Sequence, residues 1–167
     1  MAYSNPIMKI TSSTEYGMRL LVCLGKSFDR NPLTAEHLSA RENVPRGFVD
    51  QILLKLRRAR IVKSVRGSTG GYLLAKLPSE ITVGEVLRAL DGVVFEEVCG
   101  KYSLGEKSCG HGSTECLLSP VWTGLSRVTS DFLDRVTLSQ ILNHCVSTDA
   151  PAKPAPALNP FTAFHAH

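Results

Sequence analysis

Apolar residues recur at the spacing of a helix face in the first third of the chain and predict three helices there. The first helix covers residues 12–28, and its inward positions are expected to be Tyr16, Leu20, Cys23 and Leu24. A short second helix, with Leu38 inside it, is capped by Thr34. After a tight turn at residues 44–47, the third helix places four apolar residues inward, namely Val49, Ile52, Leu53 and Leu56.

The pattern then changes to that of two short β-strands and a further helix. Residues 61–65 and 71–75 are predicted strands, joined by the glycine-rich tip "RGSTGG". The helix that follows has its boundaries marked in the sequence: Thr82 and Glu85 form a capping box, and Gly92 supplies the stop.

A second amphipathic pattern lies towards the C-terminal end. Residues 119–136 carry five apolar side chains three or four positions apart, namely Val121, Leu125, Val128, Phe132 and Val136. Such a seam favours packing against another helix, either in the same domain or in a second copy of the chain, and the pattern leaves both open. A short last helix begins at a second capping box, Thr137 and Gln140. From residue 147 onward, the Pro- and Ala-rich composition predicts disorder.

The composition is that of one ordinary globular domain. Of the 167 residues, 43% are hydrophobic and 20% are charged. The start of the chain has no basic region followed by an apolar run, and no apolar stretch is long enough to cross a bilayer. We therefore expect a cytoplasmic protein with no membrane partner.

The net charge of +4 hides an uneven distribution. Residues 1–90 hold 14 basic and 7 acidic residues, a net +7, whereas residues 91–167 hold 5 and 8, a net −3. From Arg46 to Arg66 there are seven basic residues and one acid, Asp50. A basic stripe is the electrostatic signature of nucleic-acid binding, although a merely solvated face carries the same pattern.

The order of the predicted elements favours a DNA-binding role. A helix, a short helix, a turn, a basic helix and a hairpin form a winged helix-turn-helix, in which the basic helix enters the major groove and the hairpin is the wing. Gln51 can bond to adenine and Arg46 to guanine or phosphate. Arg66 of the wing can lie along a phosphate or in the minor groove, and Gly67 helps the tip to approach DNA closely. Three further basic residues are suited to the DNA backbone, namely Lys55, Arg57 and Arg58.

Two other interpretations of this half are a winged helix that contacts proteins and a nucleotide-binding loop. The tip "RGSTGG" lacks the Gly-Lys-Ser/Thr ending of a phosphate loop and does not open a helix, which argues against nucleotide binding. The pattern favours DNA over protein contacts and leaves the latter open.

Three of the five cysteines, Cys99, Cys109 and Cys116, fall within eighteen residues. An odd total and a cytoplasmic setting argue against a disulfide framework, and a loop rich in Gly, Ser and Lys offers little core for cysteines to fill. The C-x9-C-x6-C spacing fits poorly with zinc ribbons and fingers, whereas an iron–sulfur cluster tolerates irregular spacing. A redox thiol switch also stays open, since Lys101 and Lys107 favour a thiolate while nearby glutamates oppose it.

The stretches "MKITSSTEYGMRLLVCLG", "LTAEHLSARENVPRGFVDQILLKLRRARIVKSVRGSTGGYLLAK" and "ITVGEVLRALDG", together with the three cysteines that follow them, carry a family resemblance. They resemble the IscR/NsrR family of winged-helix iron–sulfur transcription regulators (the Rrf-two superfamily). The most specific features are the wing pattern Val-Arg-Gly-x-x-Gly-Gly-Tyr at residues 65–72 and the ordered cysteine trio. The resemblance extends over residues 8–142.

Pattern and resemblance together predict a mainly α fold: a winged helix-turn-helix domain with a two-stranded β wing plus a long dimerisation helix. In order along the chain, the predicted parts are an N-terminal extension (1–7), a DNA-binding domain (8–92), a cysteine-rich cluster-binding loop (93–118), a dimerisation helix with a short terminal helix (119–146) and a disordered tail (147–167).

The resemblance also implies a homodimer that binds a double-stranded DNA operator and holds an iron–sulfur cluster, 2Fe–2S in preference to 4Fe–4S. Cys99, Cys109 and Cys116 match the family's three ligands in order. Some members take the fourth ligand from an acidic residue just before the aromatic of the first helix, which is Glu15 here. His111, inside the loop, is the rival ligand.

The chain departs from the family at one ligand position and agrees with it at the DNA-contact positions. Ser119 stands where other members supply a histidine ligand, which closes that route. Gln51 and Arg66 match the family's DNA contacts, and Phe48 stands where an aromatic is usual.

The predicted function is therefore that of a transcriptional repressor whose cluster state controls operator binding in response to redox state, nitric oxide or iron supply. The alternative is a cluster-free regulator whose cysteines oxidise directly. No paired carboxylates, nucleophile–base motif or cofactor loop is visible in the sequence, so no enzyme is expected.

Overall fold

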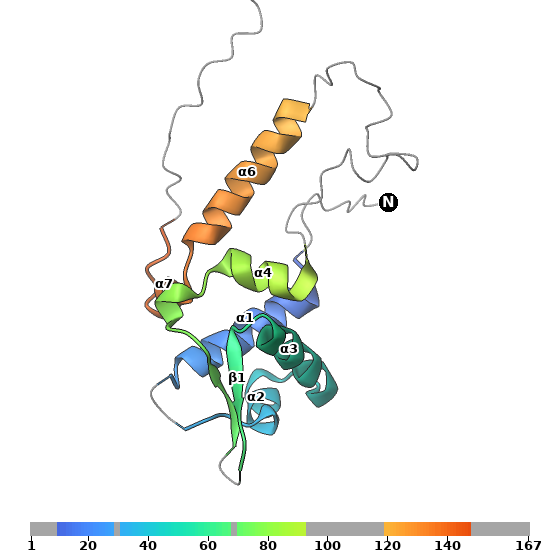
Figure 1. Ribbon diagram of the computed structural model, residues 1–167, viewed down its shortest axis with the longest axis vertical. Coiled ribbons are helices and arrows are strands. Elements are labelled where there is room, and N and C mark those ends of the chain that lie inside the picture. Colours follow the sequence, from blue (N-terminus) through green and yellow to red (C-terminus); the bar gives the residue numbers. More distant parts are fainter. Residues whose placement is uncertain (1–9, 29–30, 68–69, 93–118, 148–167) are drawn as a thin grey trace, which may run out of the picture.

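A computed structural model describes residues 10–28, 31–67, 70–92 and 119–147 (Figure 1). The described chain is mainly helical with one two-stranded antiparallel sheet, as the sequence predicted. Its elements are α1 (Ser12–Gly25), α2 (Ala35–Glu42), α3 (Arg46–Arg58), β1 (Val62–Val65), β2 (Gly71–Leu74), the 3-10 turn η1 (Pro78–Glu80), α4 (Val83–Asp91), α6 (Ser119–Arg135) and α7 (Leu138–Leu142). The predicted extension, cysteine loop and tail lie outside the described residues, apart from Ser147.

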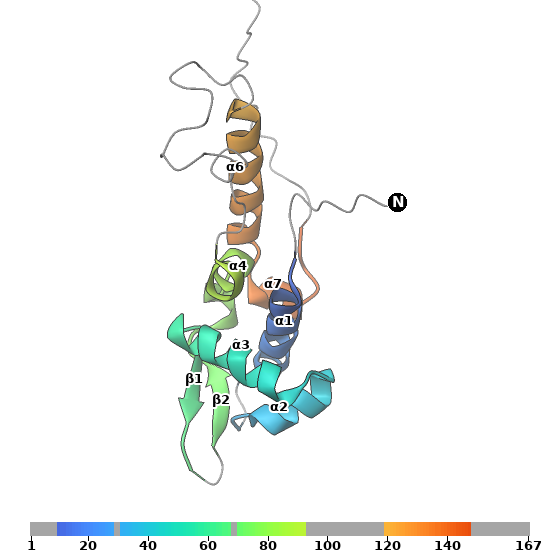
Figure 2. The same cartoon turned by 90° about the vertical axis from the view of Figure 1, so that its right-hand side faces the viewer.

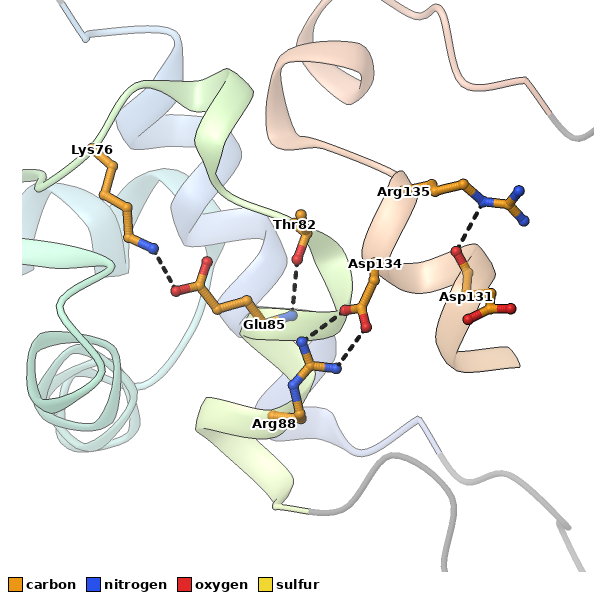
Figure 3. Close-up of polar contacts among 7 residues, drawn as sticks. All are labelled: Lys76, Thr82, Glu85, Arg88, Asp131, Asp134 and Arg135. Atoms are coloured by element: carbon orange, nitrogen blue, oxygen red, sulfur yellow. Dashed lines mark hydrogen bonds and ion pairs between the residues drawn. The ribbon is translucent and has the colours of Figure 1, made fainter. Parts of the chain in front are cut away.

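Threonine side chains start four of the helices. Thr11, Thr34, Thr82 and Thr137 each accept a hydrogen bond from the backbone N–H three residues on, which satisfies a donor that the helix leaves free. The capping box predicted at Thr137 is complete. The one predicted at Thr82 is only half formed, because the Glu85 carboxylate accepts from Lys76 Nζ at 2.5 Å instead (Figure 3).

The start of α3 differs from its prediction. Pro45 occupies the cap position, makes no side-chain cap bond and is followed at once by helical residues. Arg46 and Gly47, which were expected in a turn, therefore form the first turn of α3. The chain reverses before them, at Asn43, which has a left-handed backbone with φ of 52°.

The core lies between α1, α3 and α4 and is closed by α2 and the sheet. The apolar positions predicted for α3 are all buried, with at most 1% of their surface exposed: Val49, Ile52, Leu53 and Leu56. Leu20 and Leu24 of α1 are buried with them. Gly17 lets α1 approach α4 closely, because a Cβ there would come within 2.3 Å of Leu90 Cδ1.

The sheet is a hairpin in which Val62 pairs with Leu74 and Val65 with Gly71. Leu33 forms an isolated bridge to Tyr72, so the segment before α2 is attached to the hairpin. In Figures 1 and 2 the two strands of the hairpin extend away from the helices, which is the geometry of a wing. We call α1 to α4, the hairpin and α7 the head.

Helix α6 stands apart from the head, and we call it the arm (Figures 1 and 2). Its base is fixed by backbone bonds, Val83 N–H to Val136 O at 2.9 Å and Leu138 N–H to Ile81 O at 2.8 Å. An Arg88–Asp134 ion pair of 2.7 Å lies beside them (Figure 3).

The head covers only the C-terminal end of the predicted apolar seam. Val136 is 8% exposed, whereas Val121, Leu125 and Val128 are 58%, 40% and 59% exposed. Packing against the described head therefore does not account for the first three seam positions. No helix in the described ranges is both long and apolar enough to span a membrane.

Candidate nucleic-acid interface

Helix α3 has one buried and one basic face. Opposite its four buried apolar residues, the side chains of Arg46, Gln51, Arg57 and Arg58 are exposed. Helix α2 precedes α3 across the tight turn, and the wing follows it (Figure 2). The structure thus places the predicted DNA-contacting residues on one helix and on the hairpin that follows it.

Arg46 is held by two carboxylates. Its Nε donates to both carboxylate oxygens of Asp50 at 3.1 Å, and its Nη1 pairs with Glu36 of α2. The Arg46 side chain is nevertheless 42% exposed. The sequence singled out Arg46 but gave no sign of its partner Glu36, which lies ten residues earlier.

Phe48 packs inside the head rather than standing free on the surface. Its ring is half-buried and meets the Tyr16 ring edge to face, with centroids 5.7 Å apart. The Arg19 guanidinium lies 5.7 Å from the Tyr16 centroid. The described contacts of Phe48 therefore attach the start of α3 to α1, and its predicted DNA contact stays a prediction.

Lys55 also has a partner within the head. Its Nζ donates to the backbone carbonyl of Leu90, at the end of α4, at 2.6 Å. This bond joins the last part of α3 to α4 and satisfies a carbonyl that the helix end leaves free. Lys55 is thus a link between two helices, and its predicted contact with the DNA backbone is untested.

The wing presents Arg66 and Gly67 to solvent. Gly67 has a φ of 115°, a conformation that favours glycine and allows the hairpin to reverse within a few residues. Lys63 of β1 is also exposed and adds a positive charge that the sequence analysis did not select. The two residues that follow it on β1, Ser64 and Val65, are exposed as well, so alternation along the strand does not single out Lys63.

The end of α4 is bonded to the start of α1 as well. The hydroxyls of Thr11 and Thr14 donate to the Asp91 carboxylate, Thr11 at 2.7 and 2.8 Å. We call Thr11, Thr14, Lys55, Leu90 and Asp91 the α4 junction. No sequence pattern indicates this junction, because its partners are up to 80 positions apart.

Among the predicted cluster ligands, only Glu15 belongs to the described residues; Cys99, Cys109, Cys116 and the rival His111 lie outside them. Glu15 is exposed in the first turn of α1. Within the described part of the chain, no hydrogen bond or ion pair engages its carboxylate. An open carboxylate can donate an oxygen to iron, and the role of Glu15 as a cluster ligand stays a prediction. The described residues contain no group of three His, Cys, Asp or Glu that could hold a metal by itself.

The two remaining cysteines have opposite environments. Cys23 is 1% exposed in the core, and its burial raises the pKa of the thiol. Cys145 is exposed after α7, with its Sγ 3.2 Å from the backbone oxygen of Asn143. Only Cys145 of this pair is accessible to an oxidant.

Comparison with known proteins supports a regulator of transcription. The Rrf2 family model, described as "Iron-dependent Transcriptional regulator", matches residues 10–144. The transcriptional regulator IscR of Aliivibrio salmonicida is 34% identical over 135 residues, which cover 81% of this chain and 77% of that protein.

Two solved structures of regulators share the fold. IscR of T. potens has a TM-score of 0.65 at 26% identity and covers 89% of this chain and 93% of its own. CymR, the global cysteine regulator of B. subtilis, has a TM-score of 0.68 at 26% identity and covers 82% and 98%. The predicted winged helix-turn-helix fold is confirmed.

Proposed function

This chain belongs to the Rrf2 family of iron-dependent transcriptional regulators, and we propose that it is a homodimeric repressor whose operator binding depends on an iron–sulfur cluster. The relatives are DNA-binding regulators and not enzymes, so the protein is an IscR-like regulator of transcription. The proposal adds the cluster, the dimer and a cytoplasmic location beside the DNA.

The main support for DNA binding is that α3 has one buried apolar face and one exposed basic face. Its apolar face is fully used in the core, so its exposed polar face is free to enter a major groove while the wing contacts the adjacent backbone. Gln51 is suited to an adenine edge, and Arg57, Arg58 and Arg66 to phosphates. Each phosphate contact releases counterions, so binding should weaken steeply with salt.

The uncovered stripe of the arm supports the homodimer. Val121, Leu125 and Val128 lie on one face of α6 and are exposed. A second copy offers the same stripe, and two such helices can bury it symmetrically. Two heads joined in this way would bind half-sites about one helical turn apart.

The ligand set proposed for the cluster is Cys99, Cys109, Cys116 and Glu15. When bound, an iron–sulfur cluster supplies redox and ligand-exchange chemistry. Glu15 is positioned by the cap of α1, since Thr11 bonds both to the first turn and to Asp91. A carboxylate is a harder and more exchangeable ligand to iron than a thiolate, which suits a cluster that responds to oxidants, nitric oxide or iron shortage.

The α4 junction supports a route from that region to the DNA surface. Residue 93, where the predicted cysteine loop begins, follows directly on the end of α4. That end is bonded to α1 through Asp91 and to α3 through Lys55. A change in the loop can therefore bias the position of α3 through contiguous hydrogen bonds.

The test is purification without air, followed by visible absorption and intact native mass. A coloured dimer with two clusters is expected, and its mass separates 2Fe–2S from 4Fe–4S. Glu15→Ala should lower the amount of cluster that each dimer retains while the dimer stays intact. His111→Ala is the matched control and should retain as much cluster as the wild type. A change in affinity for a selected operator after cluster removal is also expected. A colourless dimer after expression with ample iron and sulfide would contradict the proposal.

A thiol switch is the second candidate, favoured by the accessible thiol of Cys145 and by the likeness to CymR. On this alternative, oxidation of the metal-free protein would change DNA binding, and Cys145→Ser would abolish the change. Our proposal expects iodoacetamide to label Cys145 readily and Cys23 only on unfolding, with no effect of Cys145→Ser on DNA binding.

A further inference from the structure

Arg46 stands at a helix start where a positive charge is unfavourable. It is the first residue of α3, whose first turn contains no acidic residue. The dipole of a helix makes its N-terminal end partly positive, so an arginine there does not stabilise the helix. Two carboxylates lie against it instead: Asp50, one turn later in α3, and Glu36, in the first turn of α2.

These contacts leave one end of the guanidinium open. Nε is taken by Asp50, and one donor of Nη1 is taken by Glu36. A guanidinium has five N–H donors in a fixed plane. Nη1 and Nη2 therefore keep donors at the tip of the side chain, and the two carboxylates fix the direction of that tip.

We propose that Arg46 reads a guanine base in the major groove and that Asp50 and Glu36 orient it for this contact. The inference rests on the proposed DNA binding of α3. Guanine presents O6 and N7 on its major-groove edge, two neutral acceptors that match a pair of arginine N–H groups. The partner cytosine presents an amino donor, which suits a carboxylate such as Asp50.

A phosphate is the other partner that an arginine accepts, and the surroundings of Arg46 disfavour it. Arg46, Asp50 and Glu36 together carry a net charge of −1 at neutral pH. A phosphate here would add a further negative charge next to two carboxylates, and like charges at such distances repel. A neutral base edge avoids this repulsion and keeps the ion pairs in place.

Arg57 provides a matched comparison within the same helix. It is exposed like Arg46, but no ion pair engages it within the described residues. Its positive charge is not offset, so it suits a phosphate. The two arginines should therefore respond differently to the same substitution.

The experiment selects binding sites from a pool of duplexes of random sequence, using the wild type, Arg46→Ala and Arg57→Ala. The wild type should enrich a motif with guanine at a symmetric pair of positions. Arg46→Ala should lose that guanine alone and bind the selected site about tenfold to a hundredfold more weakly, with little change in salt slope. Arg57→Ala should select the same motif but bind all duplexes more weakly by the same factor. The slope of the logarithm of the binding constant against the logarithm of salt concentration should fall in magnitude by about one.

A second pair of variants tests the orienting role. Asp50→Asn combined with Glu36→Gln should raise affinity for duplexes outside the motif and reduce the preference for guanine. Arg46→Lys keeps the charge but not the planar fork, so it should also lose the preference. These three side chains are 42% (Arg46), 48% (Asp50) and 72% (Glu36) exposed, and circular dichroism checks that each variant is folded.

The outcomes separate this inference from the proposed function. If Arg46→Ala still selects the whole motif but binds every duplex more weakly by the same factor, Arg46 is a phosphate contact. That result overturns the inference and leaves the proposed DNA binding standing. If the wild type enriches no sequence at all, the proposed operator binding and the inference both fail.

Discussion

The head and the arm are built from the same kind of amphipathic helix, but only the head covers its own apolar residues. The inward positions of α3 are at most 1% exposed, while Val121, Leu125 and Val128 of α6 are 58%, 40% and 59% exposed. Within residues 10–28, 31–67, 70–92 and 119–147, the chain therefore has a buried core in the head and an uncovered apolar stripe on the arm. Contiguous exposed apolar surface of this kind marks an interaction site.

The difference lies in the surroundings and not in the helices themselves. Helix α3 packs against α1, α2, α4 and β1, and these elements together cover its apolar face. Helix α6 meets the head only at its base, near Asp134 and Val136. Stability should therefore depend on the head within each chain, and assembly on the arm between chains.

The largest effect is expected in the core of the head, where two adjacent leucines form a matched pair. Leu53 is 0% exposed and Leu54 is 39% exposed. Leu53→Ala should lower the free energy of unfolding by about 2–5 kcal/mol, because it removes buried methyl groups and leaves a cavity. Leu54→Ala should cost less than about 1 kcal/mol. Urea unfolding measures both, and equal losses would contradict the division of α3 into two faces.

The next effect is expected on the arm. Val128→Asp would place a carboxylate in the proposed interface, so the dimer Kd should rise by about a hundredfold while the unfolding of the head stays unchanged. Thr123→Asp, on another face of α6, is the control and should leave the Kd as it is. Analytical ultracentrifugation over a range of concentrations measures both. A dimer that survives Val128→Asp would place the interface elsewhere.

The contrast between head and arm also shows what could be predicted from the sequence. The order of the helices and strands and the buried positions of α3 were predicted correctly, because amphipathic periodicity is a local property, but α1 ends at Gly25 and not at the predicted residue 28. The first turn of α3 was wrong by two residues, since Pro45 and Gly47 indicate a turn equally well. The apolar seam of α6 was predicted, but the exposure of its residues was not. The same spacing occurs in helices that pack in their own domain and in helices that pack against a second copy.

The polar contacts of the site could be predicted only in part. The exposure of Gln51 follows from its position on the polar face of a helix, and that of Arg66 from its position directly after β1, where the hairpin turns. Lys55 was expected to face DNA, yet it donates to Leu90, 35 positions away, and no local pattern predicts such a bond. Glu85 was assigned to its own helix cap, but the ammonium of Lys76 offers its carboxylate a charged partner.

A smaller effect is expected at the α4 junction, on the side of the head where the predicted cysteine loop begins. Asp91→Asn removes a charged acceptor of two threonine hydroxyls, so it should cost about 1–3 kcal/mol of unfolding free energy. Thr14→Val should cost less, because Thr11 keeps its bond to Asp91. Asp131→Asn, an equal change on the exposed arm, is the control. Thermal unfolding measures all three, and a loss of the same size in Asp131→Asn would remove the special role of the junction.

The smallest effect is expected where head and arm meet. Arg88 and Asp134 pair there at 2.7 Å, but their side chains are 47% and 44% exposed (Figure 3). Exposed ion pairs contribute little, so Asp134→Asn should lower the free energy of unfolding by less than about 1 kcal/mol, and by less still at high salt. The backbone bonds of Val83 and Leu138 remain in this variant and should keep the arm in place. Urea unfolding at low and high salt, with the dimer Kd measured alongside, checks this. A large loss that salt does not reduce would mean that the ion pair, and not the backbone, holds the arm to the head.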